Sequence, residues 1–259
     1  MSTRRIEDLS KEFGGVHAGE DLSFELDSGL VHSIIGPNGA GKTTLLNLLT
    51  GVYLPSTGRV TLDGRDLTGL PAHGFAAAGI GRTFQNLQIF SNMTALENVM
   101  TGRHLRERCS LWSAMLRTPS LVRAEREGRE QALQLLRFVG LAEYADAGAD
   151  SMPYGALKRL EIARALAGKP KFLLLDEPAA GLNPTESMEV AELIRQLAIQ
   201  GNTVVLVEHN MKLVMGVSDR IVVLDYGRKL CEGTAEQVRC DPRVIEAYLG
   251  ASTEEAAHA

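Results

Sequence analysis

The sequence predicts an α/β fold in which helices cover a mostly parallel sheet. Three apolar runs carry this prediction: "VHSIIG" (31–36), "KFLLLDEP" (171–178) and "NTVVLVEH" (202–209). A helical pattern follows each run, in the order "AGKTTLLNLLTG" (40–51), "ESMEVAELIRQLAIQG" (186–201) and "NMKLVMGVSD" (210–219). Such alternation is typical of parallel strands that are joined by crossover helices.

Polar side chains stand where these strands are expected to end. Lys42, Asp176, Glu177 and His209 all come at or after the end of an apolar run. Parallel sheets of this kind bind their ligands beyond the carboxyl ends of the strands. We therefore expect these four side chains to lie at one edge of the sheet.

Two other regions predict antiparallel strands. "LSFELDSG" (22–29) and "GRVTLDGRDL" (58–67) alternate apolar and polar residues between Gly and Asp turns, which indicates an antiparallel β subdomain beside the core. "IVVLDYGRKLCEG" (221–233) predicts a hairpin that turns at Tyr226 and Gly227, followed by a closing helix in "DPRVIEAYLG" (241–250).

The chain is expected to form one domain over residues 1–250. Residues 1–87 and 158–250 would make the core with its antiparallel part, and residues 88–157, which lack a strand-like run, would make an α-helical subdomain. Residues 251–259 read as a flexible tail.

Composition narrows the class of protein. With 44% hydrophobic and 23% charged residues in 259, the chain has the make-up of a globular domain. A net charge of -5 does not indicate a nucleic-acid-binding protein, although it leaves room for a local basic face. Cys109, Cys231 and Cys240 show no CxxC spacing, which indicates a reduced, cytosolic compartment. We expect neither a secretory signal nor a membrane-spanning helix, since the latter needs about 20 mainly apolar residues.

"GPNGAGKTT" (36–44) has the pattern and context of a phosphate-binding P-loop, because it follows an apolar strand and opens an apolar helix. Its glycines let backbone N–H groups turn toward an anion at a helix N-terminus. Lys42 would reach the β- and γ-phosphates of ATP, and the Thr43 hydroxyl suits Mg²⁺. The bland alternative is a Gly-rich turn. The residues expected to touch nucleotide are Gly36, Pro37, Asn38, Gly39, Ala40, Gly41, Lys42, Thr43 and Thr44.

"FLLLDEP" (172–178) supplies a second chemical element. A buried strand that ends in two carboxylates is costly unless the charges meet a cation or water. Asp176 can hold Mg²⁺, directly or through water, and Glu177 can orient or deprotonate an attacking water. An exposed acidic strand end is the alternative. The pairing of this element with Lys42 and Thr43 favours the hydrolytic interpretation.

With these motifs in place, nearly the whole chain resembles the ATP-binding subunit of an ABC transporter. The resemblance implies the ABC ATPase fold, which is a P-loop NTPase core with flanking antiparallel β and α-helical subdomains. It also implies roles for Gln85 in "RTFQN" (82–86), which would touch Mg²⁺ and the attacking water, and for His209, which would reach the γ-phosphate. "AAGLNP" (179–184) stands at the D-loop position. Phe13, helped by Val16, would stack on adenine.

Each of these three roles has a plain alternative. A lone Gln in a loop is usually only solvated, and a lone His after a strand is usually a surface or core residue. Phe13 taken alone is more often part of a hydrophobic core.

More narrowly, the chain resembles the branched-chain amino acid importer branch. The residues that carry this are "GRTFQNLQIFSNMTALENVMTGRH" (81–104), "KRLEIARAL" (158–166), "LDEPAAGLNPTE" (175–186), "VEHNMKLVMGVSDRIVVLDYGRKLCEGT" (207–234) and "DPRVIEAYLG" (241–250). The resemblance implies two membrane permeases, a second homologous ATPase subunit or a second copy of this chain, and a binding protein that acts indirectly. It places the chain on the cytoplasmic face of the membrane as a peripheral subunit, with no nucleic acid partner.

Other functions stay open. Relatives of the same architecture import urea or short amides. A non-transport ABC ATPase in DNA repair or translation is disfavoured by the acidic balance, and by the lack of a coiled-coil insertion or a tandem ATPase domain. A regulatory subunit with negligible hydrolysis is disfavoured because Lys42, Gln85, Asp176, Glu177 and His209 are all present.

"MPYGA" (152–156) stands where the family has Leu-Ser-Gly-Gly-Gln. There, the N-terminus of a helix would approach ATP on the partner subunit, so that Pro153, Tyr154 and Gly155 act in trans. Pro153 lacks the Ser hydroxyl, and a hydrogen bond to a charged group is worth about 1.5–3 kcal/mol. That corresponds to about one to two decades of rate, so we expect a weakened signature rather than an inactive one. Asn183, which replaces a common Asp, also acts across the dimer in the resemblance.

The Arg-rich stretch 103–137 and "LQIF" (87–90) would form part of the docking surface for the permeases. The alternative is a solvated helix face.

Overall fold

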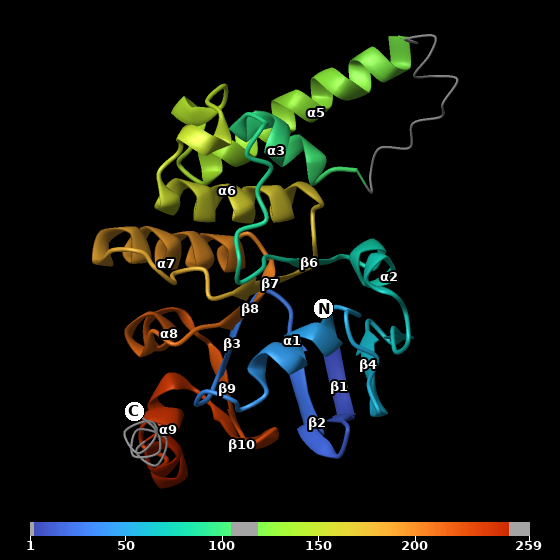
Figure 1. Ribbon diagram of the computed structural model, residues 1–259, viewed down its shortest axis with the longest axis vertical. Coiled ribbons are helices and arrows are strands. Elements are labelled where there is room, and N and C mark those ends of the chain that lie inside the picture. Colours follow the sequence, from blue (N-terminus) through green and yellow to red (C-terminus); the bar gives the residue numbers. More distant parts are fainter. Residues whose placement is uncertain (1–2, 105–118, 249–259) are drawn as a thin grey trace.

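The computed structural model describes residues 3–104 and 119–248. Figure 1 shows a β-rich lower half and a group of helices above it. The flexible tail expected at 251–259 lies outside the described residues, and so do Cys109 and the part of the Arg-rich stretch that contains Arg106, Arg108 and Arg117.

The core of the described residues is a six-stranded sheet with the order β10-β9-β3-β8-β7-β6. Its strands are β3 (Val31–Ile35), β6 (Ile80–Arg82), β7 (Phe172–Asp176), β8 (Thr203–Val207), β9 (Arg220–Asp225) and β10 (Arg228–Gly233). Every residue of β3, β7 and β8 is buried, which explains why these strands read as continuous apolar runs. Neighbours from β6 to β9 pair in parallel, as the sequence predicts.

The hairpin predicted at the end of this sheet is confirmed. β9 and β10 pair antiparallel, and the turn residues Tyr226 and Gly227 have φ angles of 43° and 79°. Two consecutive positive φ values are typical of the tight turn that matches the twist of a hairpin. The expected closing helix is present at residues 242–248, after α9 (Ala235–Arg239).

A second, antiparallel sheet has the order β2-β1-β4-β5 in the described chain. It comprises β1 (Thr3–Phe13), β2 (Val16–Asp27), β4 (Thr57–Leu62) and β5 (Arg65–Asp66). The antiparallel β part is therefore confirmed for β2 and β4, whereas β1 was not anticipated. Ile6 and Leu9 of β1 are at most 1% exposed and join a core with Leu45 and Leu46 of α1 (Lys42–Leu49).

Helices cover the core sheet and build the upper part of the molecule. The flanking helices are α2 (Ala72–Ala77), α7 (Pro184–Ile199) and α8 (Met211–Val217). Above them lie α3 (Ala95–Thr101), α5 (Pro119–Phe138), two short 3-10 helices (Ala142–Tyr144 and Ala149–Ser151) and α6 (Tyr154–Ala167). The subdomain boundary expected between 157 and 158 falls inside α6, which runs on without a break.

None of the helices in the described ranges combines the length and the apolar character that crossing a membrane requires.

Candidate active site

The loop 36–44 connects β3 to α1, and close packing requires its glycines. A Cβ on Gly41 would lie 2.4 Å from the carbonyl oxygen of Ala18, and one on Gly36 would lie 2.2 Å from that of Leu224. Gly41 also has a φ of 94°, which L side chains rarely adopt. The backbone of Gly36 contacts Tyr248 by a hydrogen bond, and burial raises the pKa of this tyrosine to about 12. The C-terminal helical stretch therefore supports the loop.

Lys42 is the first residue of α1 and is only 7% exposed. Its Nζ donates hydrogen bonds to the carbonyl oxygens of Gly36 (2.7 Å) and Pro37 (2.8 Å). Burial lowers the pKa of Lys42, and the charge of Glu177 opposes that effect. The ammonium group therefore lies folded against its own loop and close enough to Glu177 for the two charges to interact.

The outer face of the loop is open. Asn38, Gly39 and Thr43 are exposed, and Pro37 and Thr44 are partly so, whereas Ala40 is buried. Backbone N–H groups at the head of a helix, next to a buried ammonium, make a site that favours an anion such as phosphate.

Asp176 is the last residue of β7 and is 3% exposed. Its Oδ2 accepts a hydrogen bond from Nη2 of Arg82 at 3.1 Å, and its backbone N–H donates to the hydroxyl of Thr83. Burial raises the pKa of Asp176, and the bond to Arg82 acts in the opposite direction. Arg82 was missed by the sequence reasoning, because its partner lies in another strand and no local pattern announces it.

The donors near this carboxylate fit a magnesium ion. Oδ1 of Asp176 receives no hydrogen bond from any residue that the structure describes. Thr43, whose side chain carries a hydroxyl, is exposed in the first turn of α1. Carboxylate and hydroxyl oxygens are the donors that Mg²⁺ takes from proteins, which usually supply one or two ligands beside phosphate and water.

Glu177 follows Asp176 and meets His209, which follows β8. Nε2 of His209 lies 3.0 Å from Oε1 of Glu177. The backbone N–H of Glu177 donates to Val207 at 2.9 Å, and its φ is 49°, in the left-handed region. Glu177 is the first residue beyond the strand, so this turn points its carboxylate away from the β7 direction and toward His209 and Lys42.

Gln85 lies in the exposed loop after β6, and side chains of α6 contact the backbone of that loop. Nζ of Lys158, which is 2% exposed, approaches the carbonyl oxygens of Gln85 (3.5 Å) and Glu177 (3.3 Å). One turn later, Glu161 accepts hydrogen bonds from the backbone N–H groups of Phe84 and Gln88. α6 therefore contacts both the Gln85 loop and the Glu177 turn.

Glu208 is a second residue that the sequence reasoning missed. It is 4% exposed, and its carboxylate accepts hydrogen bonds from the backbone N–H groups of Ala179 (2.7 Å), His209 (3.1 Å) and Asn210 (3.3 Å). It thereby ties the segment after Glu177 to the turn that carries His209. A charged residue that directly follows a fully apolar strand was the available signal.

Pro153, Tyr154 and Gly155 stand at the start of α6. Pro153 is the N-cap, with φ -60° and ψ 151°, and no side chain among the described residues caps this helix. Tyr154 is 47% exposed and packs on Gly181, and a Cβ on Gly155 would meet the carboxylate of Glu186 at 2.4 Å. Their neighbours are thus residues around the start of α7 rather than the loop 36–44.

Asn183 is engaged within its own chain. Its Oδ1 accepts from the N–H of Glu186 at 2.9 Å, and the Glu186 carboxylate accepts from the N–H of Asn183 at 3.0 Å. This capping box fixes the start of α7.

Phe13 ends β1 and is 42% exposed, so the alternative of a core residue is excluded. Its ring meets Tyr53 edge to face, with 5.3 Å between the centroids, and the Lys11 ammonium lies 4.9 Å from the ring centroid. Val16, at the start of β2, is 68% exposed.

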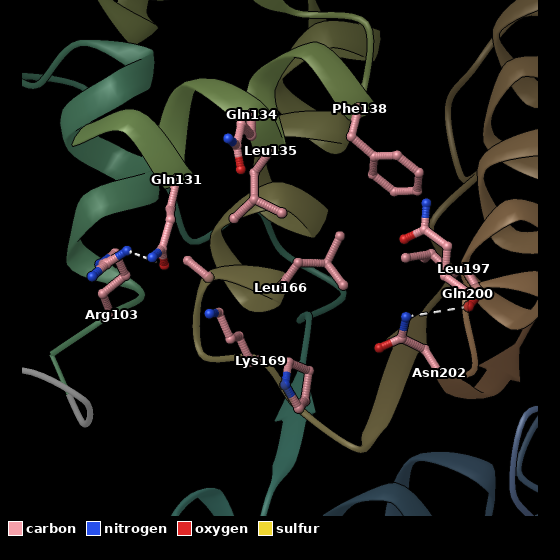
Figure 2. A pocket seen from close by; sticks show the side chains of 12 residues that line it. Arg103, Gln131, Gln134, Leu135, Phe138, Leu166, Lys169, Leu197, Gln200 and Asn202 are labelled. Carbon is pink, nitrogen blue, oxygen red and sulfur yellow. Dashed lines mark hydrogen bonds between the residues drawn. The ribbon is translucent and has the colours of Figure 1, made fainter. Parts of the chain in front are cut away.

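A pocket of about 570 Å³ lies elsewhere, between α5, α6 and the end of α7. Figure 2 shows amide and cationic side chains around an apolar floor, with Arg103 bonded to Gln131 and Asn202 bonded to Leu197. Pro170 and Asn202 precede β7 and β8, so the pocket lies at the amino ends of those strands. The residues at their carboxyl ends, Asp176 and His209, do not line it.

Comparisons with known proteins agree with this geometry. A family model described as "ABC transporter" matches residues 20–180, and one described as "Branched-chain amino acid ATP-binding cassette transporter" matches residues 228–253. The high-affinity branched-chain amino acid transport ATP-binding protein BraF of Pseudomonas aeruginosa is 46% identical, over 95% of this chain and 96% of that protein. LivG of Escherichia coli, of the same description, is also 46% identical with the same coverage. The lipopolysaccharide export system ATP-binding protein LptB of Acidithiobacillus ferridurans is 37% identical over 89% of each chain.

Solved structures are similar over nearly the full length. The ADP conformation of MJ1267, an ATP-binding cassette of an ABC transporter, is 33% identical with a TM-score of 0.84, over 96% of this chain and 99% of that one. A nucleotide-free cassette from an ABC transporter is 32% identical with a TM-score of 0.83 and the same coverage. The fold class predicted from the sequence is confirmed.

Proposed function

Because the chain belongs to the ABC transporter family of ATP-binding proteins, we propose that it is the ATP-hydrolysing motor of an importer for branched-chain or other hydrophobic amino acids. The names of BraF and LivG support this substrate class, and so does the match of residues 228–253 to the branched-chain family model. Selectivity itself would reside in the permeases and the binding protein.

The meeting of charged and polar groups around Glu177 supports hydrolysis most directly. The charges of Lys42 and Glu177 are close enough to interact, and His209 contacts Glu177 at 3.0 Å. Asp176 directly precedes Glu177 in the chain. These groups come from three separate strand ends, and together they supply a phosphate-binding cation, a metal-binding carboxylate and a base.

ATP would bind with its phosphates on the loop Gly36–Thr44. The backbone N–H groups of the loop would bind the phosphate oxygens, and Nζ of Lys42 would exchange its carbonyl partners at Gly36 and Pro37 for the β- and γ-phosphates. The exposed ring of Phe13, next to Tyr53, would stack on adenine.

Thr43, Asp176 and Gln85 would hold Mg²⁺. When bound, the ion supplies positive charge to the β- and γ-phosphate oxygens as they become more negative. Asp176 offers Oδ1 for this purpose, because Oδ2 is engaged by Arg82.

Glu177 would act as the base in hydrolysis. Its carboxylate accepts a proton from the attacking water while the water oxygen bonds to the γ-phosphorus and the bond to the β–γ bridging oxygen breaks. His209 would orient the carboxylate before nucleotide binds, and its Nε2–H would donate to the γ-phosphate in place of Glu177 when ATP is bound. Gln85 would position the water. Lys42 stabilises the charge that develops on the phosphoryl group.

A second subunit would complete the site. In a head-to-tail dimer with a homologous ATPase, or with another copy of this chain, Pro153, Tyr154 and Gly155 of one subunit face the ATP of the other. The N-terminus of α6 still offers backbone donors and a favourable dipole, although Pro153 contributes no hydroxyl.

The chain would work on the cytoplasmic face of the membrane against two permeases, with a binding protein that delivers the ligand and with no nucleic acid partner. Phe90 of the "LQIF" segment suits a docking surface, because it is 47% exposed and held in place by Asn98, which bonds to its backbone N–H and carbonyl. Arg164 lies over its ring at 5.7 Å. The described arginines of the stretch 103–137 would extend this surface.

Co-purification with an affinity-tagged chain tests the proposal. A permease pair and ATP hydrolysis that is stimulated by a binding protein loaded with leucine are expected. Stimulation by urea or a short amide instead would assign the related importer. Recovery with ribosomes or DNA, without membrane proteins, would assign the non-transport function.

A further inference from the structure

We propose that Arg82 is the positioning residue of the magnesium site, because it fixes the Asp176 carboxylate relative to the helix that carries Thr43. This inference rests on the proposed function, since it concerns the metal ion of the same site. Arg82 opens the "RTFQN" stretch as the last residue of β6, and the roles expected for that stretch fall on Gln85 and not on Arg82.

The guanidinium group of Arg82 connects three elements. Nη2 donates to Oδ2 of Asp176 at the end of β7 (3.1 Å), and Nη1 donates to Oδ1 of Asn47 (2.6 Å) and to the hydroxyl of Thr50 (3.0 Å). Asn47 lies in α1 and Thr50 is its C-cap. A single planar fork therefore links the end of β7 to the helix that begins with Lys42 and Thr43.

The link is enclosed. The side chain of Arg82 is 10% exposed and that of Asp176 is 4% exposed, so water screens their interaction little. The ring of Phe84, 5.2 Å from the guanidinium carbon, covers one side. Because Phe84 neighbours Gln85, the same guanidinium group also lies beside the loop that contributes the third metal-binding residue.

Two of the three residues that would bind magnesium come from separate elements of the core, Thr43 from α1 and Asp176 from β7. Their relative position is set by whatever joins those elements near the site, and Arg82 joins them directly. Mg²⁺ demands nearly ideal octahedral geometry with short bonds, whereas Ca²⁺ accepts variable geometry and longer bonds. A loosened site should therefore lose Mg²⁺ much more than Ca²⁺.

The difference between the Mg²⁺ and Ca²⁺ affinities distinguishes an effect of Arg82 on ligand geometry from an effect of its charge. Removal of a positive charge beside the site would strengthen the binding of both ions about equally, so the ratio of the two affinities cancels that effect. The ratio depends on geometry, which is the property that we assign to Arg82.

The test measures binding of a fluorescent, non-hydrolysable ATP analogue (mant-AMPPNP) at increasing Mg²⁺ or Ca²⁺, together with binding in EDTA. For Arg82→Met we expect the half-saturating Mg²⁺ concentration to rise about tenfold relative to that of Ca²⁺, in line with other residues that hold a metal ligand. Binding in EDTA should be unchanged. Arg82→Lys keeps the charge but not the fork and should show most of the same change. Arg126→Met, which removes a surface arginine paired with Glu130 on its own helix, serves as the matched control.

An unchanged ratio of Mg²⁺ to Ca²⁺ affinity in a folded Arg82→Met protein would overturn the inference. If Arg82→Met does not fold, the double variant Asn47→Ala/Thr50→Val decides, because it removes both hydrogen bonds from the fork to α1 while Arg82 and Asp176 stay paired. A normal ratio in that variant would overturn the inference as well. A parent protein that binds no nucleotide under any condition would instead refute the proposed function.

Discussion

Nε2 of His209 and Oε1 of Glu177 are 3.0 Å apart, although the two residues follow different strands of the core sheet. The contact fixes the direction of a carboxylate that would otherwise rotate freely at a strand end. Glu177 is thereby held toward the side of the sheet where Lys42 lies.

Glu177→Gln should abolish most of the ATP hydrolysis and spare nucleotide binding. The amide keeps the shape and can still contact His209, but it cannot accept a proton from water. We expect the rate to fall at least about a hundredfold. Phosphate release by the assembled complex measures the rate, and retention of ATP measures binding. The exposed Glu192→Gln change is the control, and near-normal turnover in the Glu177→Gln complex would contradict the assigned base.

Pro153→Ser should raise the hydrolysis rate by no more than about one to two decades, since it restores one hydroxyl toward a phosphate. The backbone at 153 (φ -60°, ψ 151°) suits an N-cap serine, so α6 should gain a cap worth about 0.5–2 kcal/mol. The measurements are ATPase activity of the dimer and the thermal midpoint. Pro153→Ala, which has neither ring nor hydroxyl, should change neither upward. A gain far above a hundredfold would mean that the natural signature is nearly inactive.

Glu208→Gln should loosen the turn that carries His209. The buried carboxylate accepts three backbone N–H bonds, and hydrogen bonds to a charged group contribute about 1.5–3 kcal/mol each. We expect lower stability and faster hydrogen exchange at the amides of Ala179 and Asn210. Glu186 caps α7 and Glu189 pairs with Arg159, so the control is Glu143→Gln at an exposed position. Unchanged protection at Ala179 would show that the carboxylate does not hold this segment.

His32 should make the folded protein sensitive to mild acid. Burial lowers the pKa of this residue, which is 1% exposed. A hydrogen bond with the backbone of Asp27 and the charges of Asp27, Asp219 and Glu232 oppose the effect without cancelling it. The unfolded chain, with a histidine pKa of about 6.5, therefore binds more protons than the folded chain once the pH falls toward and below that value. Stability is present above that range and declines through it.

The measurement is the free energy of unfolding between pH 7.5 and pH 5. Each tenfold difference in proton affinity between the two states corresponds to about 1.4 kcal/mol. His32→Leu removes the group, so its stability should fall less steeply over the same interval, whatever its absolute value. Equal slopes for both proteins would rule out His32 as the source.

The sequence predicted the parts of the site that are local in the chain. Lys42 belongs to a run whose glycines are required by contacts such as that of Gly41 with Ala18, and Asp176 ends a strand that is buried throughout. Both features leave a signature in consecutive residues. The parallel orientation of the core strands could also be predicted, because each strand is a continuous apolar run that a helical pattern follows.

Features that depend on distant partners could not be predicted. Arg82 and Asp176 lie 94 positions apart, and the three amides on Glu208 come from two separate turns. β1 escaped notice because charged residues interrupt its few buried ones, such as Ile6 and Leu9. The local sequence can mark such a residue, as it does for the charged Glu208 after an apolar strand, but it does not show which distant groups the residue contacts.

The positive φ of Glu177 has an evolutionary consequence. A residue with a side chain in this backbone region costs of order 1–3 kcal/mol, and glycine would relieve that strain. Selection for thermal robustness alone would thus push this position toward glycine, whereas the proposed role of Glu177 as the base in hydrolysis requires an acid there. A screen for variants of higher thermal stability that also selects for function should therefore not recover Glu177→Gly, although it can recover stabilising substitutions at other positions.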